Sequence, residues 1–387
     1  MIIAAKAPNL IDIESTFNYI FGKELHAKRK LSLAYAALGV LQSESLILHE
    51  MGLGMAESRG VRKKHATKQI DRLLSNPGYD IWNISNVWVP HIIGCKKDIT
   101  VALDWTSFAN DEQHTLCLNL ITSKGSSTPL LWKTVEQNKL KNNRARYEDQ
   151  LLSKLKEVTP KDVIITLLAD RGFGDQKFFK FIEDELKFNY IIRFKKGTLV
   201  TNNKGTTKKA GEWLDKNGRA KLIKDVTITK DKHPLKQVVL VKDKDMKEEW
   251  ILASNIKNGS ARIIIKAYAK RWKIEPYFRD VKCGRFGYAL HQTHVGSCDR
   301  RDRLLLIVAL CYSILTVLGY AGEKAGFDKW LKVNTVKTRT HSLFTQGQFY
   351  YDYFRHFKDN EKKTLLESLA ETMSDDEFWI EIFSDDK

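Results

Sequence analysis

Three short apolar runs rich in β-branched residues follow one another between residues 98 and 132, and they limit the possible folds more than any other feature. They occupy residues 99–103, 115–121 and 128–132. Only short segments with polar and turn-forming residues separate them, whereas parallel strands need a crossover of a dozen or more residues. We therefore expect three antiparallel strands joined as a meander.

Helices and strands alternate after this meander. The pattern predicts a helix at 147–158, a strand at 163–168, a helix at 176–186 and a strand at 190–194. Such alternation adds strands to one sheet through helical crossovers, so the fold class is α/β with a mixed sheet. The order is also that of a ribonuclease-H-like core, although the pattern alone does not name the fold.

A basic, β-rich segment then interrupts this core. Residues 193–247 contain 16 Lys and Arg against six Asp and Glu, and strand-like stretches occur at 226–229 and 237–241. The core resumes with the apolar run 250–254, and a helix follows from about residue 261. We interpret the basic segment as an insertion.

The first ninety residues have helical periodicity. A Leu- and Ala-rich helix is expected at 30–48, and glycines at positions 52, 54 and 60 are expected to break the pattern. The basic run Arg62, Lys63 and Lys64 then leads into a second helix. This arrangement is compatible with a DNA-binding helical module, and a solvated basic helix explains it equally well.

The charge balance indicates the kind of partner. The chain carries 64 Lys and Arg against 47 Asp and Glu, a formal net charge of +17, although residues 374–387 are acidic. This excess of positive charge predicts a polyanionic binding partner, either nucleic acid or an acidic membrane face. Residues 304–321 lack a formal charge, but 18 residues is the low edge of a bilayer span, so a buried core helix is favoured.

The cysteines and the first residues favour a reducing cytosol. The five cysteines form no CxxC pair, and the sequence does not begin with the basic-then-apolar order of a signal peptide. Cys283, His291, His294 and Cys298 form an array that could hold zinc, but its spacing fits none of the usual structural zinc sites.

Two aspartates follow apolar strands of the expected sheet. Asp104 ends the first run, and Asp170 ends the strand at 163–168. Strand ends are where an α/β sheet presents side chains to a cleft. Phosphodiester chemistry uses two hard cations roughly 4 Å apart, which need converging carboxylates. Many acids of this chain lie near strand ends, so the pair alone is weak evidence.

A third acid lies in the helix after the resumed core. Tyr268, Arg271, Glu275 and Lys282 stand at i, i+3, i+7 and i+14, which places all four on one face of a continuous α-helix. An acid between cationic and phenolic side chains is a plausible metal ligand with phosphate contacts beside it. A solvated amphipathic helix is the alternative, and Pro276 predicts a kink directly after Glu275.

These four residues match the Tyr-x2-Arg-x3-Glu-x6-Lys signature, and the sequence resembles the DDE transposases of bacterial insertion-sequence family four. The run 170–174 (Asp-Arg-Gly-Phe-Gly) is similar to the family's second-aspartate motif, and Asp104 after a strand is similar to the first. The basic insertion resembles the β-domain that interrupts the family's ribonuclease-H-like core. The resemblance covers about residues 95–340.

The resemblance implies a role for each matching residue. Asp104, Asp170 and Glu275 would be the catalytic carboxylates and would bind two Mg²⁺ or Mn²⁺ ions per active site. Tyr268, Arg271 and Lys282 would hold phosphates near the transposon end. Trp250 resembles a tryptophan that stacks on a flipped base in members that form DNA hairpins, although its spacing is a few residues short; core packing is the alternative.

The resemblance also implies a reaction and partners. The enzyme would hydrolyse the phosphodiester at each transposon end, and the released 3′-hydroxyl would attack either the opposite strand, giving a hairpin, or target DNA. A homodimer would join two ends in a synaptic complex in the bacterial cytoplasm, associated with the nucleoid and not with a membrane. The rivals are a non-catalytic DNA-binding inhibitor or domesticated derivative, and a metal-dependent nuclease of the same fold.

On this interpretation the chain divides into five segments. They are a helical N-terminal DNA-binding region (1–95), the first part of the catalytic core (96–196), the basic β-rich insertion (197–247), the second part of the core (248–300) and a helical C-terminal region assigned to dimerisation (301–387).

Overall fold

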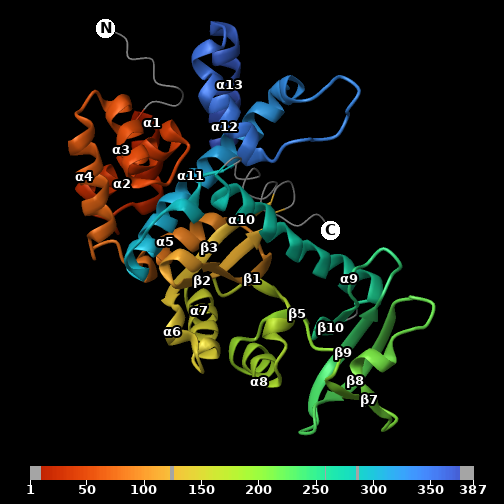
Figure 1. Ribbon diagram of the computed structural model, residues 1–387. Helices are drawn as coiled ribbons and strands as arrows, with labels where there is room; N and C mark the ends of the chain where they lie inside the picture. The colour runs from red at the N-terminus through yellow and green to blue at the C-terminus, as the bar shows by residue number, and fades with distance from the viewer. Residues whose placement is uncertain (1–9, 123–125, 258, 285–286, 375–387) are drawn as a thin grey trace.

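The computed structural model describes residues 10–122, 126–257, 259–284 and 287–374, and a ten-stranded mixed sheet lies at its centre (Figure 1). The strands follow the order β3-β2-β1-β4-β5-β10-β9-β8-β6-β7. Their bounds are β1 Asp98–Phe108, β2 Gln113–Ile121, β3 Ser127–Glu136, β4 Ile164–Ala169, β5 Asn189–Arg193, β6 Leu199–Thr201, β7 Thr207–Lys209, β8 Lys221–Ile228, β9 His233–Val241 and β10 Trp250–Ser254.

The first half of the sheet has the expected topology. β1, β2 and β3 pair antiparallel, whereas β4 pairs parallel to β1 on one side and to β5 on the other. The expected α/β fold class, a mixed sheet between helical N- and C-terminal regions, is therefore confirmed.

The basic segment does not form a separate sheet. β10 pairs antiparallel with both β5 and β9, and β8, β6 and β7 continue outward from β9. The insertion thus extends the core sheet, because its last long strand shares hydrogen bonds with the strand that returns to the core.

From residue 10, where the described part of the chain begins, five helices form the N-terminal region: α1 Leu10–Phe21, α2 Ala27–Ser43, α3 Leu48–Arg59, α4 Lys63–Ser75 and α5 Ile81–Ile93. The expectation that glycines at 52 and 54 break a helix was wrong, because both lie inside α3. A Cβ at Gly52 would lie 2.1 Å from Thr67 Oγ1, and one at Gly54 would lie 2.5 Å from the Gly39 carbonyl oxygen. These glycines let helices approach closely, and only Gly60, with φ of 64°, ends the helix.

Helices of the core follow β3, β4 and β10. They are α6 Gln137–Leu140, α7 Arg144–Val158, α8 Gln176–Lys180, which continues as a π-helical turn over Phe181–Leu186, α9 Ala261–Ala269 and α10 Ile274–Lys282. Figure 1 shows α9 and α10 running end to end from the core towards the insertion.

The sequence predicts a kink after Glu275, but the break in the α-helix lies before this residue. Residues 270–273 form a 3-10 turn, and Pro276 lies in the first turn of α10, where its missing N–H costs nothing.

The C-terminal helices are α11 Cys298–Lys324, α12 Leu343–Tyr353 and α13 Asp359–Ser374. α11 is long and apolar enough to cross a bilayer, but 89 % of its apolar window is buried inside the protein. It packs against β3, where Asp302 accepts a hydrogen bond from the Thr134 amide at 2.9 Å. α11 is thus a buried helix of the core, as favoured from the sequence. The acidic residues 375–387 lie outside the described residues.

Candidate active site

Asp104 and Asp170 lie side by side at the point where the parallel pairing of β1 with β4 ends. β1 continues to Phe108, so Asp104 lies within the strand and not after it, because the antiparallel pairing with β2 extends beyond the parallel pairing with β4. The last parallel pair is Leu103 with Ala169, and each aspartate is the next residue. Each carboxylate accepts a hydrogen bond from the amide that follows it, at 2.8 Å and 2.7 Å.

Arg271 connects two of the three acids. Its side chain is only 6 % exposed; Nη1 lies 3.5 Å from Asp104 Oδ2, and Nη2 lies 3.7 Å from Glu275 Oε1. Its Nε is buried and has no hydrogen-bond partner among the described residues. One guanidinium therefore balances an acid of β1 and an acid of α10.

Asp170 is held by two other side chains. The buried Tyr268 donates its hydroxyl to Asp170 Oδ1 at 3.4 Å, and Arg193 Nη1 lies 3.7 Å from the same oxygen. The Tyr268 ring meets the half-buried Trp250 edge-on, with ring centroids 5.0 Å apart. Two other residues of the predicted set, Tyr268 and Trp250, therefore form one continuous group with Asp170.

The carboxylates influence one another electrostatically. Burial raises the pKa of Asp104, Arg271 opposes this shift, and the charge of Asp170 adds to it. Burial also raises the pKa of Glu275, again opposed by Arg271, and the charges of Asp104 and Asp170 raise it further. Because the three carboxylates repel one another, added positive charge would stabilise their ionised forms.

The donor set of this group suits a hard cation. All three side chains offer carboxylate oxygens, which Mg²⁺ and Mn²⁺ prefer. In the part of the chain that the structure describes, however, no three His, Cys, Asp or Glu side chains are close enough together to hold a metal ion as they stand. The same finding applies to the zinc array, where His291 Nδ1 bonds instead to the Lys282 carbonyl and His294 lies 3.6 Å from Asp111.

Lys282 points back into the fold. Its ammonium group hydrogen-bonds to Thr106 Oγ1 and lies 3.4 Å from the Ser107 carbonyl oxygen, 5.0 Å from the centre of the Phe108 ring. Burial lowers the pKa of this lysine. The contacts fix the end of α10 against β1, the strand that carries Asp104.

Comparison with known protein families identifies the family of the chain that carries these residues. The model of the transposase DDE domain matches residues 96–314, a span that contains β1, β4 and α10. The chain belongs to the DDE transposase family. No curated protein matches the chain. Transposases of this family act on DNA, and their domains generally use divalent metal ions.

The predicted DNA-binding residues of the N-terminal region lie elsewhere in the transposase. Lys63 and Lys64 are exposed in the first turn of α4, and Arg62 is the N-cap residue. Sequence reasoning missed Lys68 and Arg72, which are also exposed and continue the line from Lys64 at four-residue spacing. That spacing was the signal that could have found them.

A second group beside Asp104 was also missed. Glu148 is 6 % exposed, and its Oε1 accepts hydrogen bonds from Trp105 Nε1 at 2.7 Å and Arg144 Nε at 3.1 Å. Arg144 also lies 5.2 Å from the centre of the Trp105 ring. Glu148 thereby fixes the residue that follows Asp104. The four-residue spacing of Arg144 and Glu148 indicates a helical ion pair, but not its partner in β1.

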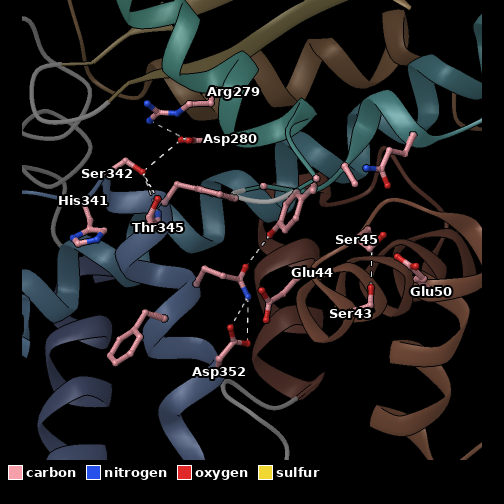
Figure 2. A pocket seen from close by; sticks show the side chains of 18 of the residues that line it. Ser43, Glu44, Ser45, Glu50, Arg279, Asp280, His341, Ser342, Thr345 and Asp352 are labelled. Carbon is pink, nitrogen blue, oxygen red and sulfur yellow. Dashed lines mark hydrogen bonds and ion pairs between the residues drawn. The ribbon is translucent and has the colours of Figure 1, made fainter. Parts of the chain in front are cut away.

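A separate cavity of about 960 Å³ lies between the N-terminal helices, the end of α10 and α12 (Figure 2). Asp280 faces Ser342 there, with 3.4 Å between Ser342 Oγ and Asp280 Oδ2. Burial raises the pKa of Asp280 to about 6. None of Asp104, Asp170 and Glu275 lines this cavity, so it is distinct from the candidate active site.

Proposed function

We propose that this transposase cleaves phosphodiesters at transposon ends and joins the released 3′-hydroxyl to target DNA, with Asp104, Asp170 and Glu275 as its catalytic carboxylates. The supporting observation is that the Arg271 guanidinium contacts both Asp104 and Glu275, while the charge of Asp170 acts on both. Membership of insertion-sequence family four, with Tyr268 and Lys282 completing its signature, is part of the same proposal.

The three carboxylates would hold two Mg²⁺ or Mn²⁺ ions. When bound, such a pair activates the attacking oxygen and stabilises the leaving oxygen. Arg271 now balances two of the carboxylates, so once cations take over that task its guanidinium becomes available for a DNA phosphate. Tyr268 keeps Asp170 in place throughout, because its hydroxyl donates to that carboxylate.

Lys282 and Trp250 would act on the DNA beside this centre. The charge of Lys282 would neutralise a phosphate from a position that Thr106 and Phe108 fix. Trp250 is half-buried and opens β10 next to Tyr268, which suits stacking on a flipped base during hairpin formation or another second-strand step.

The remaining DNA affinity would come from two basic regions. Arg62, Lys63 and Lys64 lie at the start of α4, and the insertion contributes lysines along β7, β8 and β9. Such contacts to phosphates make binding weaken steeply with salt. The proposal includes a homodimer that joins two transposon ends in the bacterial cytoplasm, in association with the nucleoid.

One assay separates this proposal from its rivals. The protein is incubated with Mg²⁺, a target plasmid and DNA carrying the sequences that flank the coding sequence on both sides. Joined products support the transposase, cleavage without joining supports a nuclease of the same fold, and binding without cleavage supports a non-catalytic derivative. The Asp104→Asn variant on the same DNA is the control, because contaminating nucleases are unaffected by it.

A further inference from the structure

Glu248 lies between two arginines that flank Asp170. Its Oε2 accepts hydrogen bonds from Arg171 Nη1 at 3.2 Å and from Arg193 Nη2 at 2.6 Å. Arg171 follows Asp170 in the sequence, and Arg193 contacts the Asp170 carboxylate at 3.7 Å. The hydrogen bond from Arg193 and the charge of Arg171 lower the pKa of Glu248, so this carboxylate is ionised at neutral pH.

The same side chains line a cavity of about 590 Å³. Lys195 and Lys196 also line it, and the second of these pairs with Glu249 at 3.4 Å. Gly197 leaves part of the wall open, since a Cβ there would meet no atom within 4 Å. The cavity therefore has a cationic lining whose charge is only partly balanced by two consecutive glutamates.

This arrangement resembles the recognition of a phosphate group. Guanidinium groups bind phosphate and carboxylate oxygens with the same geometry, so one carboxylate oxygen between two arginines occupies the place of a phosphate oxygen. The Glu248 side chain is 51 % exposed, and ion pairs of exposed groups contribute little to stability. A DNA strand, which offers many phosphates, can displace such a partner.

We propose that Arg171 and Arg193 form a phosphate subsite beside Asp170, and that Glu248 occupies this subsite until a DNA phosphate displaces it. The inference rests on the proposed function in that DNA is the ligand. Glu248 then acts as a competitor built into the chain. It weakens binding of any DNA, and the contacts of a correctly placed end must overcome it.

The test measures binding without cleavage. A fluorescent duplex of about 20 base pairs is titrated with the full chain in EDTA at about 0.15 M salt, where charges beyond roughly 8 Å are screened. Glu248→Gln keeps the shape and removes the charge. It should bind about three- to tenfold more tightly, the range expected for freeing two exposed ion pairs, and its affinity should fall more steeply with salt.

Two further variants make the result specific. Asp162→Asn removes another exposed carboxylate, which pairs with Lys97 before the amino end of β4, and should leave the affinity unchanged. In an Arg193→Ala background, Glu248→Gln should raise the affinity for DNA by less than half of the fold-increase seen in the wild-type background. The increase is smaller because one of the two cations that Glu248 masks is absent. Melting temperatures close to that of the wild type verify that the variants fold.

Two results would overturn the inference: equal affinity of Glu248→Gln and the wild type, or the same tightening in the Arg193→Ala background. Failure of every variant and the wild type to bind DNA would instead overturn the proposed function, and the inference with it.

Discussion

The guanidinium of Arg271 lies 3.5 Å from the carboxylate of Asp104, which joins the turn before α10 to the first strand of the core. Both groups are largely buried, and the arginine extends its second nitrogen to Glu275 at 3.7 Å. The contact means that the charge state of the proposed catalytic group depends on one cation of the chain itself.

Replacement of any one carboxylate should abolish cleavage and spare DNA binding. Asp104→Asn, Asp170→Asn and Glu275→Gln each remove one proposed metal ligand but no proposed phosphate contact, so cleavage should fall at least about a hundredfold. Affinity for DNA should stay within about threefold, as measured by fluorescence anisotropy. Near-normal cleavage by one of these variants would remove that residue from the catalytic set.

Loss of Arg271 should destabilise the metal-free protein. Arg271→Ala leaves Asp104 partly buried without its main counter-charge, at a cost of about 1–3 kcal/mol near pH 7. Millimolar Mg²⁺ should recover part of this loss in calorimetry, because cations would take over the neutralisation. In the Arg271→Ala, Asp104→Asn double variant the recovery should be much smaller. An equal effect of Mg²⁺ on both would argue against carboxylate ligation.

Lys282 allows its charge and its packing to be separated. Lys282→Met keeps most of the aliphatic contact with Phe108 and Phe278 but removes the charge. If Lys282 neutralises a phosphate, the slope of log affinity against log salt should flatten by about one. Thr106→Val is the matched control, since it removes the hydrogen-bond partner of the lysine and leaves the charge. An unchanged slope for Lys282→Met would assign the lysine to packing alone.

Trp250 should matter after the first nick. An aromatic face returns roughly 1–3 kcal/mol per stacked base, so Trp250→Ala should slow second-strand cleavage about ten- to a hundredfold and spare the first nick. Trp88, which is 1 % exposed, is the control for core packing. Trp88→Ala should cost about 3–5 kcal/mol of stability and reduce all steps together. The same behaviour in Trp250→Ala would contradict the stacking role.

Asp280 should make stability depend on pH. Its pKa is raised from 3.8 to about 6 in the folded protein, so the folded state holds a proton that the unfolded state has lost between these values. Its contribution to stability therefore falls as pH rises through this window, by at most about 3 kcal/mol. Asp280→Asn should gain stability relative to the wild type between pH 4 and pH 7 in denaturant titrations. A constant difference over this range would contradict the shift.

Local patterns predicted much of the sheet and of the candidate site. Apolar alternation located β1 to β5, and the strand ends pointed to Asp104 and Asp170, which the structure places next to each other. The exact end of β1 was wrong because pairing with β2 continues past the point where β4 stops. Where β1 ends depends on both neighbouring strands, β2 and β4, and the sequence of β1 alone does not contain that information.

Contacts between distant segments could not be predicted in this way. Arg193 and Glu248 are 55 residues apart, and only the pairing of β5 with β10 brings them together. Gly52 and Gly54 interrupt helical propensity in a sequence, but here Thr67 and the Gly39 backbone occupy the space of their missing side chains. The sequence pattern contains the residue types but not the tertiary neighbours that decide their effect.

The two outer strands of the ten-stranded sheet affect how molecules of this protein meet. An open strand edge is a template for pairing with another chain. At one end, α5 and α11 lie against β3. The indole N–H of Trp88 in α5 donates a hydrogen bond to the Pro129 carbonyl, and the indole N–H of Trp132 donates one to the Asp302 carbonyl in α11. At the other end, β7 is only three residues long, fully exposed, and includes Lys208 and Lys209. Like charges and a short ladder oppose edge-to-edge growth, so the outer strands themselves protect the protein against aggregation through an open edge of the sheet.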